Sequence, residues 1–276
     1  MSAGSVLRLA VRVHRRQAEL VLAELLELAP SGVEEVEVSP DVIEYAVYGA
    51  PGELPAVPDL RAAAGGAYVD VSTREIADDW AERWRSFHRP LVIGDRLTVR
   101  PPWEPPGGTA LDVVVDPGQA FGTGSHATTR LCLELMVDLD SDARSGSFID
   151  VGCGSGVLSI VAAKLGFAPV IALDYDRAAT TATRENAARN GVELDVRDFD
   201  MRVEQAPRAD CGAANVLGGP LVTWAASQRE LPPTLILSGL LATEADGVAA
   251  AYARRGHRER ERRVSGDWAA LLLIGA

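Results

Sequence analysis

Residues 150–156 read Asp-Val-Gly-Cys-Gly-Ser-Gly and constrain the fold more than any other segment of this 276-residue chain. They end an apolar stretch, residues 148–151, that predicts a buried strand, and they precede residues 157–165, which predict a helix. Glycine allows backbone conformations that other residues avoid, so a ligand can approach such a turn closely. This strand-to-helix turn is typical of a doubly wound α/β sheet, in which ligands bind beyond the carboxyl ends of the strands.

The rest of the C-terminal part continues the same alternation. Further strands are expected at residues 170–173, 193–196, 209–214 and 234–238, and further helices at 177–190, 220–228 and 243–255. Two final strands, residues 259–264 and 268–274, are joined by a Ser-Gly-Asp turn. We therefore predict a mainly parallel, seven-stranded, Rossmann-like sheet that ends in an antiparallel hairpin.

The N-terminal part has a different pattern. Strands are expected at residues 6–13, 33–38, 42–48 and 67–72, with helices at 15–28 and 58–64. The order β-α-β-β-α-β predicts a small ferredoxin-like α+β domain. We expect three parts: a ferredoxin-like domain at residues 1–73, a helical linker at 74–90 and the α/β domain at 91–276. Within the last part, residues 91–100 and 110–115 predict a hairpin around the loop 101–108.

Composition limits the classes of partner. The net charge of −12 argues against a protein that grips phosphate backbones over a wide surface, and it could help to attract a basic protein. The three cysteines are widely spaced and form no Cys/His ligand pattern, so no metal site is expected. The first residues do not resemble a signal peptide, and the longest apolar stretch, residues 268–274, is too short to span a membrane. We expect a cytoplasmic protein without direct nucleic-acid or membrane binding.

The glycine spacing distinguishes between two cofactors. Gly152, Gly154 and Gly156 follow the pattern GxGxG, and Asp174 ends the next strand, at the distance where a carboxylate reaches the hydroxyls of a ribose. A dinucleotide site has the pattern GxGxxG, but its third glycine position is Val157 here. The shorter spacing suits a ligand without a pyrophosphate, and we therefore predict S-adenosylmethionine, with a nicotinamide cofactor as the alternative.

A second glycine-rich segment, residues 116–129, precedes the sheet. It could be a surface loop that leads into a helix near residue 128, or a lid that closes over a ligand, and Phe121, Gly122 and Gly124 are candidate cofactor contacts. Thr128 and Thr129 could cap the helix or hydrogen-bond the methionine part of the cofactor. His126 is a possible base, although a lone histidine more often has a positional role.

Asn215 ends the fourth parallel strand and begins the sequence Asn-Val-Leu-Gly-Gly-Pro. Enzymes that methylate the exocyclic amines of bases have an Asp/Asn-Pro-Pro-aromatic motif at the equivalent place. Here Val216, Leu217 and Gly218 replace the prolines and the aromatic ring, so an amine can be oriented but a flat base has no stacking platform. We predict that the Asn215 side chain, or a nearby carbonyl group, accepts the hydrogens of a protein amine and orients its lone pair.

Several of these motifs together resemble one known family. Trp80, Trp84 and Phe87-His88, then DPGQAFGTGSHATT, DVGCGSG, Asp174 and ANVLGGPL are similar to the bacterial ribosomal protein L11 methyltransferases, a class I methyltransferase family. The resemblance implies trimethylation of α-amino and lysine ε-amino groups of that ribosomal protein. It also implies that the N-terminal domain holds the substrate while the catalytic domain swings on the linker.

The resemblance also implies individual residue roles. Carried over position by position, the family's cofactor contacts fall on Thr129, Gly152, Asp174 and Asn215. The chain departs from the family pattern at Ala127, where the family usually has proline, and at Pro232-Pro233, where it usually has two glycines.

Three other possibilities remain open at this stage. The chain could methylate another protein or a small amine, or it could bind the cofactor without transferring a methyl group, as a ribosome-assembly partner. We expect a monomer, and the sequence does not identify which amines are modified.

Overall fold

The computed structural model describes residues 6–18, 21–22, 25, 33–49, 68–76, 89–116, 126–140, 144 and 146–275. The chain divides into two compact units, residues 1–87 and 88–276, and each is described by itself. No helix among these residues has the length and apolar character needed to cross a membrane.

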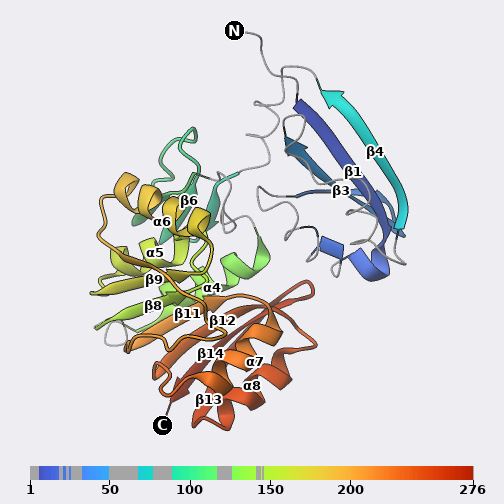
Figure 1. Cartoon of the computed structure of the whole chain (residues 1–276). Coiled ribbons are helices and arrows are strands. Elements are labelled where there is room, and N and C mark those ends of the chain that lie inside the picture. Colours follow the sequence, from blue (N-terminus) through green and yellow to red (C-terminus); the bar gives the residue numbers. More distant parts are fainter. Residues whose placement is uncertain are drawn as a thin grey trace. The chain divides into compact units, whose positions relative to one another are not determined.

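The N-terminal unit contains a four-stranded antiparallel sheet in the order β2-β3-β1-β4 (Figure 1). Its strands are β1 (Val6–His14), β2 (Glu34–Ser39), β3 (Val42–Gly49) and β4 (Tyr68–Ile76). Strand β3 lies between β1 and β2, as in the split β-α-β unit of ferredoxin-like domains, which confirms the predicted fold of this part. The predicted helix at residues 58–64 lies outside the described residues.

Alternation of apolar and polar residues along β1 separates the two faces of this sheet. Leu9, Val11 and Val13 are buried and pack against Val21 and Leu25, which are helical residues. The helix expected at residues 15–28 begins as a 3₁₀ turn, η1 (Arg15–Gln17), and residues 18, 21, 22 and 25 are helical. The core of the unit therefore lies between this helix and one face of the sheet.

The prediction of a helix from residue 74 is wrong at its start. Residues 74–76 extend β4, since Arg74 pairs with Arg8 and Ile76 pairs with Val6. Pairing with β1 gives these residues backbone hydrogen bonds, which outweigh their local preference for a helix. Residues 77–88, with Trp80, Trp84 and Phe87, lie outside the described residues.

The predicted hairpin between residues 91–100 and 110–115 is also wrong. The strands are β5 (Leu91–Ile93), β6 (Leu97–Arg100) and β7 (Leu111–Val114), and β6 pairs with β7 in parallel. The hairpin joins β5 to β6 around Gly94, whose φ of 54° suits a tight turn. The loop after β6 is long enough to return the chain to the start of the sheet, so β7 runs parallel to β6.

The seven-stranded sheet of the C-terminal unit has the order β10-β9-β8-β11-β12-β14-β13. The first five strands in that order are parallel: β10 (Asp195–Asp198), β9 (Val170–Asp174), β8 (Phe148–Val151), β11 (Cys211–Asn215) and β12 (Thr234–Leu241). The last two, β14 (Trp268–Gly275) and β13 (His257–Ser265), form the antiparallel hairpin. The predicted fold class is confirmed.

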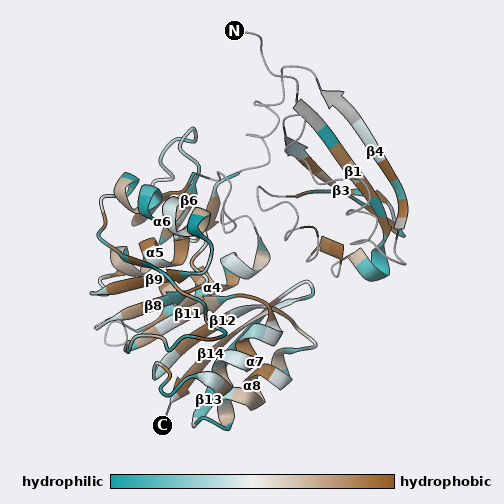
Figure 2. Ribbon diagram, in the orientation of Figure 1, coloured by the Kyte–Doolittle hydropathy of each residue, from teal (hydrophilic) through white to brown (hydrophobic). Residues whose placement is uncertain are grey.

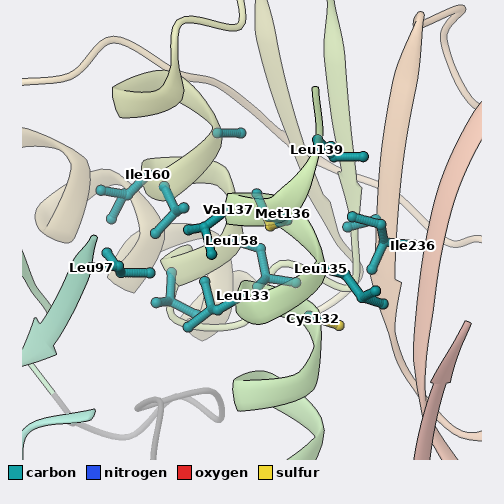
Figure 3. Packing of buried hydrophobic residues seen from close by; sticks show 14 of the residues in the cluster. Leu97, Cys132, Leu133, Leu135, Met136, Val137, Leu139, Leu158, Ile160 and Ile236 are labelled. Carbon is teal, nitrogen blue, oxygen red and sulfur yellow. The ribbon is translucent and has the colours of Figure 1, made fainter. Parts of the chain in front are cut away.

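Helices cover both faces of this sheet (Figure 1). They are α4 (Ala127–Asp138), α5 (Val157–Leu165), α6 (Arg177–Arg189), α7 (Gly218–Ser227) and α8 (Ala245–Ala253). Strands such as β8, β9 and β14 are mainly hydrophobic (Figure 2), as expected of strands covered on both faces. In Figure 3, Leu133 and Leu135 of α4 lie between Leu97 of β6 and Ile236 of β12 in one of the two resulting cores.

Candidate active site

The predicted site residues gather at the carboxyl ends of three neighbouring strands. Gly152 follows β8, Asp174 ends β9 and Asn215 ends β11, and β8 lies between the other two strands in the sheet. Because β8 is the strand from which the chain proceeds in both directions, a crevice is expected beyond its end. The residues singled out in the sequence are therefore brought to one edge of the sheet.

All three glycines of the loop have positive φ angles, which non-glycine residues rarely adopt: 78° for Gly152, 53° for Gly154 and 81° for Gly156. A Cβ atom on Gly152 would lie 2.5 Å from Cγ1 of Val216, the residue after Asn215. A Cβ atom on Gly239, which lies within β12, would be similarly close to the backbone of Val216. Two glycines thus leave room for the chain that follows Asn215. Sequence reasoning did not identify Gly239, since its role depends on packing alone.

Asp174 is joined directly to the glycine loop. Its Oδ2 accepts a hydrogen bond of 2.9 Å from Gly154 N, and its Oδ1 accepts one of 3.0 Å from Asp176 N. Burial raises the pKa of Asp174, and the backbone donors oppose that effect. The carboxylate is held in a fixed orientation beside the loop, and each oxygen retains acceptor capacity that a ribose hydroxyl could use.

Asp150 is a second carboxylate near this edge, and it was not among the contacts predicted from the sequence. It is fully buried, and its Oδ2 accepts hydrogen bonds from Ser159 N at 3.0 Å and Ser159 Oγ at 2.6 Å. Its Oδ1 has no hydrogen-bond partner among the described residues, and burial raises the pKa of Asp150 to about 7. Its position as the acidic residue at the start of the glycine motif could have identified it from the sequence.

This arrangement suits S-adenosylmethionine, which carries an ammonium group and a sulfonium centre. Two buried carboxylates, Asp150 and Asp174, lie close enough that the negative charge of Asp174 helps to raise the pKa of Asp150. A positively charged ligand would relieve that repulsion, whereas the pyrophosphate of a dinucleotide would increase it. The residues present therefore fit the predicted cofactor.

Asn215 lies opposite the start of α4. Its Nδ2 donates a hydrogen bond of 3.2 Å to Oγ1 of Thr129, which is fully buried. Its Oδ1 is buried and has no hydrogen-bond partner among the described residues. A buried acceptor without a partner is unfavourable unless a ligand supplies the donor. The side chain is thus anchored at one end and has an open acceptor at the other.

His126 is the N-cap of α4. Thr128 and Thr129, which the sequence suggested as possible caps, lie within the first turn of the helix. The Nδ1 atom of His126 accepts from Thr128 N at 3.4 Å and lies 2.8 Å from Thr128 Oγ1, and the His126 ring meets Trp268 edge-on at a centroid distance of 5.0 Å. Burial lowers the pKa of His126, which favours the neutral ring that can act as an acceptor. These contacts favour the positional role. Phe121, Gly122 and Gly124 lie outside the described residues.

A capping role for His126 predicts a specific mutational pattern. His126→Ala should lower stability by about 1 kcal/mol, whereas His126→Asn should retain most stability and turnover, because asparagine is a good N-cap. Urea unfolding and steady-state rates provide the measurements. Equal, large losses of turnover in both variants, with stability unchanged, would instead indicate a base.

The direction of the His126 pKa shift also predicts a pH dependence. With its folded-state pKa below the unfolded value of about 6.5, the unfolded chain binds more protons. The contribution of the neutral ring is complete above that pH and is lost as the pH falls towards the folded pKa. When the pH is lowered from 7.5 to 5.5, the Tm of the parent protein should therefore fall further than that of His126→Asn. Equal decreases in Tm would contradict the role of the neutral His126 ring as a cap.

The departures from the family pattern fall in different places. Ala127 is the first residue of α4, next to the cap. Pro232 and Pro233 precede β12, and their carbonyl oxygens lie 2.9 Å from His257 Nε2 and 2.6 Å from Gly275 N. That end of β12 is opposite to the strand ends where the site residues gather. The two prolines therefore affect the far edge of the sheet rather than the site.

Comparisons with known proteins agree with this geometry. The family model described as ribosomal protein L11 methyltransferase (PrmA) matches residues 59–274. The ribosomal protein L11 methyltransferase of Pectobacterium carotovorum is 43% identical over 200 residues, covering 68% of this chain and 67% of that protein. The one from Yersinia pseudotuberculosis is 45% identical over 179 residues, covering 63% and 60%.

A solved structure extends the likeness to three dimensions. The crystal structure of a ribosomal protein L11 methylase from Lactobacillus delbrueckii subsp. bulgaricus superposes with a TM-score of 0.57 at 25% identity, covering 69% of this chain and all of that one. The family model covers most of the chain, including every described site residue. The chain therefore belongs to the ribosomal protein L11 methyltransferase family, a class I methyltransferase family that uses S-adenosylmethionine.

Proposed function

We propose that this chain transfers methyl groups to α-amino and lysine ε-amino groups of ribosomal protein L11. The observation that carries the proposal is the Asn215 side chain. It is anchored on Thr129 and presents, at the carboxyl edge of the sheet, a buried Oδ1 that has no hydrogen-bond partner within the described part of the chain. Family membership supports both the reaction and the substrate.

S-adenosylmethionine supplies an electrophilic methyl group on a sulfonium. We propose that Asp174, Thr129 and the loop glycines Gly152, Gly154 and Gly156 hold the cofactor, and that Asp150 adds negative charge beside it. The contribution of the protein is then mainly positioning, since displacement at a sulfonium requires no acid for the leaving group.

The incoming amine must be neutral before it can react. An α-amine has a pKa of about 8, whereas a lysine amine has one of about 10.4, so deprotonation of the lysine costs more free energy at neutral pH. Asn215 Oδ1 accepts an N–H of the neutral amine and thereby aims its lone pair. An amide oxygen accepts a hydrogen bond from the N–H of an α-amine or of a lysine ε-amine, which suits a site that takes both groups.

The N-terminal unit is the proposed substrate-recognition domain, at residues 1–73, followed by a linker at 74–90 and the catalytic domain at 91–276. Its antiparallel sheet is separate from the sheet of the cofactor site and belongs to a compact unit of its own, which supports a separate role in recognition. The net charge of −12 favours encounter with a basic substrate. We propose that the protein acts as a monomer in the cytoplasm.

Intact-mass spectrometry of L11 after incubation with the enzyme and S-adenosylmethionine tests this function. We expect mass gains in one-methyl steps, which peptide mapping places on the N-terminal amine and on lysines. L11 with an acetylated N-terminus should lose only the α-amino steps. No gain, with cofactor binding intact by calorimetry, would move the assignment to another amine or to a non-catalytic partner role.

A further inference from the structure

Two asparagines one turn apart, Asn186 in helix α6 and Asn190 at its C-cap, hold two segments of the C-terminal unit. Asn190 exchanges two hydrogen bonds with the backbone of Val114, accepting from N at 2.9 Å and donating to O at 2.6 Å. Asn186 accepts from Asp116 N at 3.0 Å and donates to Ser155 O at 2.9 Å. The two side chains differ in reach: Asn190 holds one segment outside the helix, whereas Asn186 holds two.

One of the two segments joined by Asn186 is the glycine loop of the proposed cofactor site. Ser155 lies in the glycine loop, immediately before Gly156, and Asp116 begins the second glycine-rich segment. Asn186 is 1% exposed, so water does not compete for its amide. Arg189 strengthens the link, because it donates to Asn186 Oδ1 at 3.0 Å and to Asp116 Oδ2 at 3.3 Å.

The same face of α6 contacts the glycine loop a second time. Thr183 Oγ1 donates to Gly154 O at 2.9 Å, and a Cβ atom on Gly156 would lie 2.8 Å from the Thr183 side chain. Two successive carbonyl groups of the loop, those of Gly154 and Ser155, are thus bound by side chains of one helix. Glycines contribute no side chain that could hold the loop, so such contacts determine where its N–H groups point.

We propose that Asn186 is a positioning residue of the cofactor site. By sharing one amide between Ser155 O and Asp116 N, it keeps the glycine loop and the start of the second glycine-rich segment in a constant relative position. The loop is then formed before the cofactor arrives, and less binding free energy is spent on ordering it. The inference rests on the cofactor and is independent of which amine is methylated.

The test compares Asn186→Ala with Asn190→Ala, a matched loss of an amide one turn further along the chain, at the C-cap of α6. Binding of S-adenosylmethionine is measured by calorimetry without any protein substrate. Asn186→Ala should raise Kd about 10-fold or more, as misplacement of a preorganised site by a fraction of an ångström does. Asn190→Ala should change Kd by less than about threefold, because its bonds go to Val114 and to the backbone carbonyl of Asn186 and do not reach the glycine loop.

Amide hydrogen exchange of the cofactor-free protein, followed residue by residue by NMR, supplies a readout independent of cofactor. In Asn186→Ala the Asp116 amide should exchange faster while the Val114 amide keeps its protection, and Asn190→Ala should show the reverse. This pattern verifies that each variant is folded and has lost only the intended contact.

A third variant separates the two bonds of Asn186. Asn186→Asp retains an acceptor for Asp116 N beside Arg189 but loses the donor to Ser155 O. We expect protected exchange at Asp116 together with weakened cofactor binding. If both asparagine-to-alanine variants lose the same stability and neither alters the Kd, Asn186 is only a structural anchor and the proposal is wrong. A loss of L11 methylation with an unchanged Kd would likewise contradict it.

Discussion

Asn215→Ala should lower kcat about 100-fold while cofactor affinity falls much less. The change removes the buried Oδ1 that we propose orients the amine, and misorientation of a reacting group by about an ångström has an effect of this size. A 100-fold loss corresponds to about 2.7 kcal/mol of transition-state stabilisation. Single-turnover rates with L11 and calorimetric titration of S-adenosylmethionine give the two quantities separately.

Thr129 provides a graded control for this prediction. Thr129→Val removes the hydroxyl that accepts from Asn215 Nδ2 but leaves the amide oxygen, whereas Thr129→Ser retains the hydroxyl. Because Thr129 is also a proposed cofactor contact, rates are compared at saturating S-adenosylmethionine; we expect an intermediate rate for the valine variant and a nearly normal rate for the serine variant. Full turnover in Asn215→Ala with unchanged cofactor affinity would show that amine orientation resides elsewhere.

Gly152→Ala should destabilise the protein and weaken cofactor binding together. Its φ of 78° disfavours alanine by roughly 1–2 kcal/mol, and the added Cβ would lie 2.5 Å from Cγ1 of Val216, so the loop or the end of β11 must move. We expect a total loss of about 3 kcal/mol in urea unfolding. A displaced loop should also raise the Kd for S-adenosylmethionine about 10-fold or more.

Gly166→Ala is the matched control. Gly166 has a φ of 105° at the C-cap of α5, and a Cβ atom there would meet nothing within 4 Å. This variant should lose about 1–2 kcal/mol of stability from the backbone conformation alone and bind the cofactor normally. Equal stability losses in the two variants, with the same Kd, would mean that the contact with Val216 has no bearing on the cofactor site.

The elements that the sequence predicted best are those determined by local patterns. Helix α5 has the predicted bounds, residues 157–165, because an αL glycine stands at each end, Gly156 and Gly166. Strand β8 likewise matches its apolar run. Strand β10 is displaced by two residues from its prediction, since at the edge of the sheet its bounds depend on pairing with β9 alone.

The wrong predictions share a cause. The parallel pairing of β6 and β7 and the extension of β4 to Ile76 both depend on backbone hydrogen bonds to segments distant in the sequence. A short run of alternating residues indicates a strand but not the direction or length of its pairing. Local propensity therefore identified the segments and failed on their partners.

The sequence by itself determined the α/β fold class, the glycine loop and the polar residues at the strand ends. Strand and helix periodicity and glycine turns are local properties, so Gly152, Asp174 and Asn215 could be identified without a structure. Only the tertiary structure decided the side-chain contacts around the site. Asn215 contacts Thr129, 86 residues away, and Asn186 contacts both Ser155 and Asp116. Such hydrogen bonds depend on how distant elements pack, because a buried polar side chain takes the partner that packing brings to it.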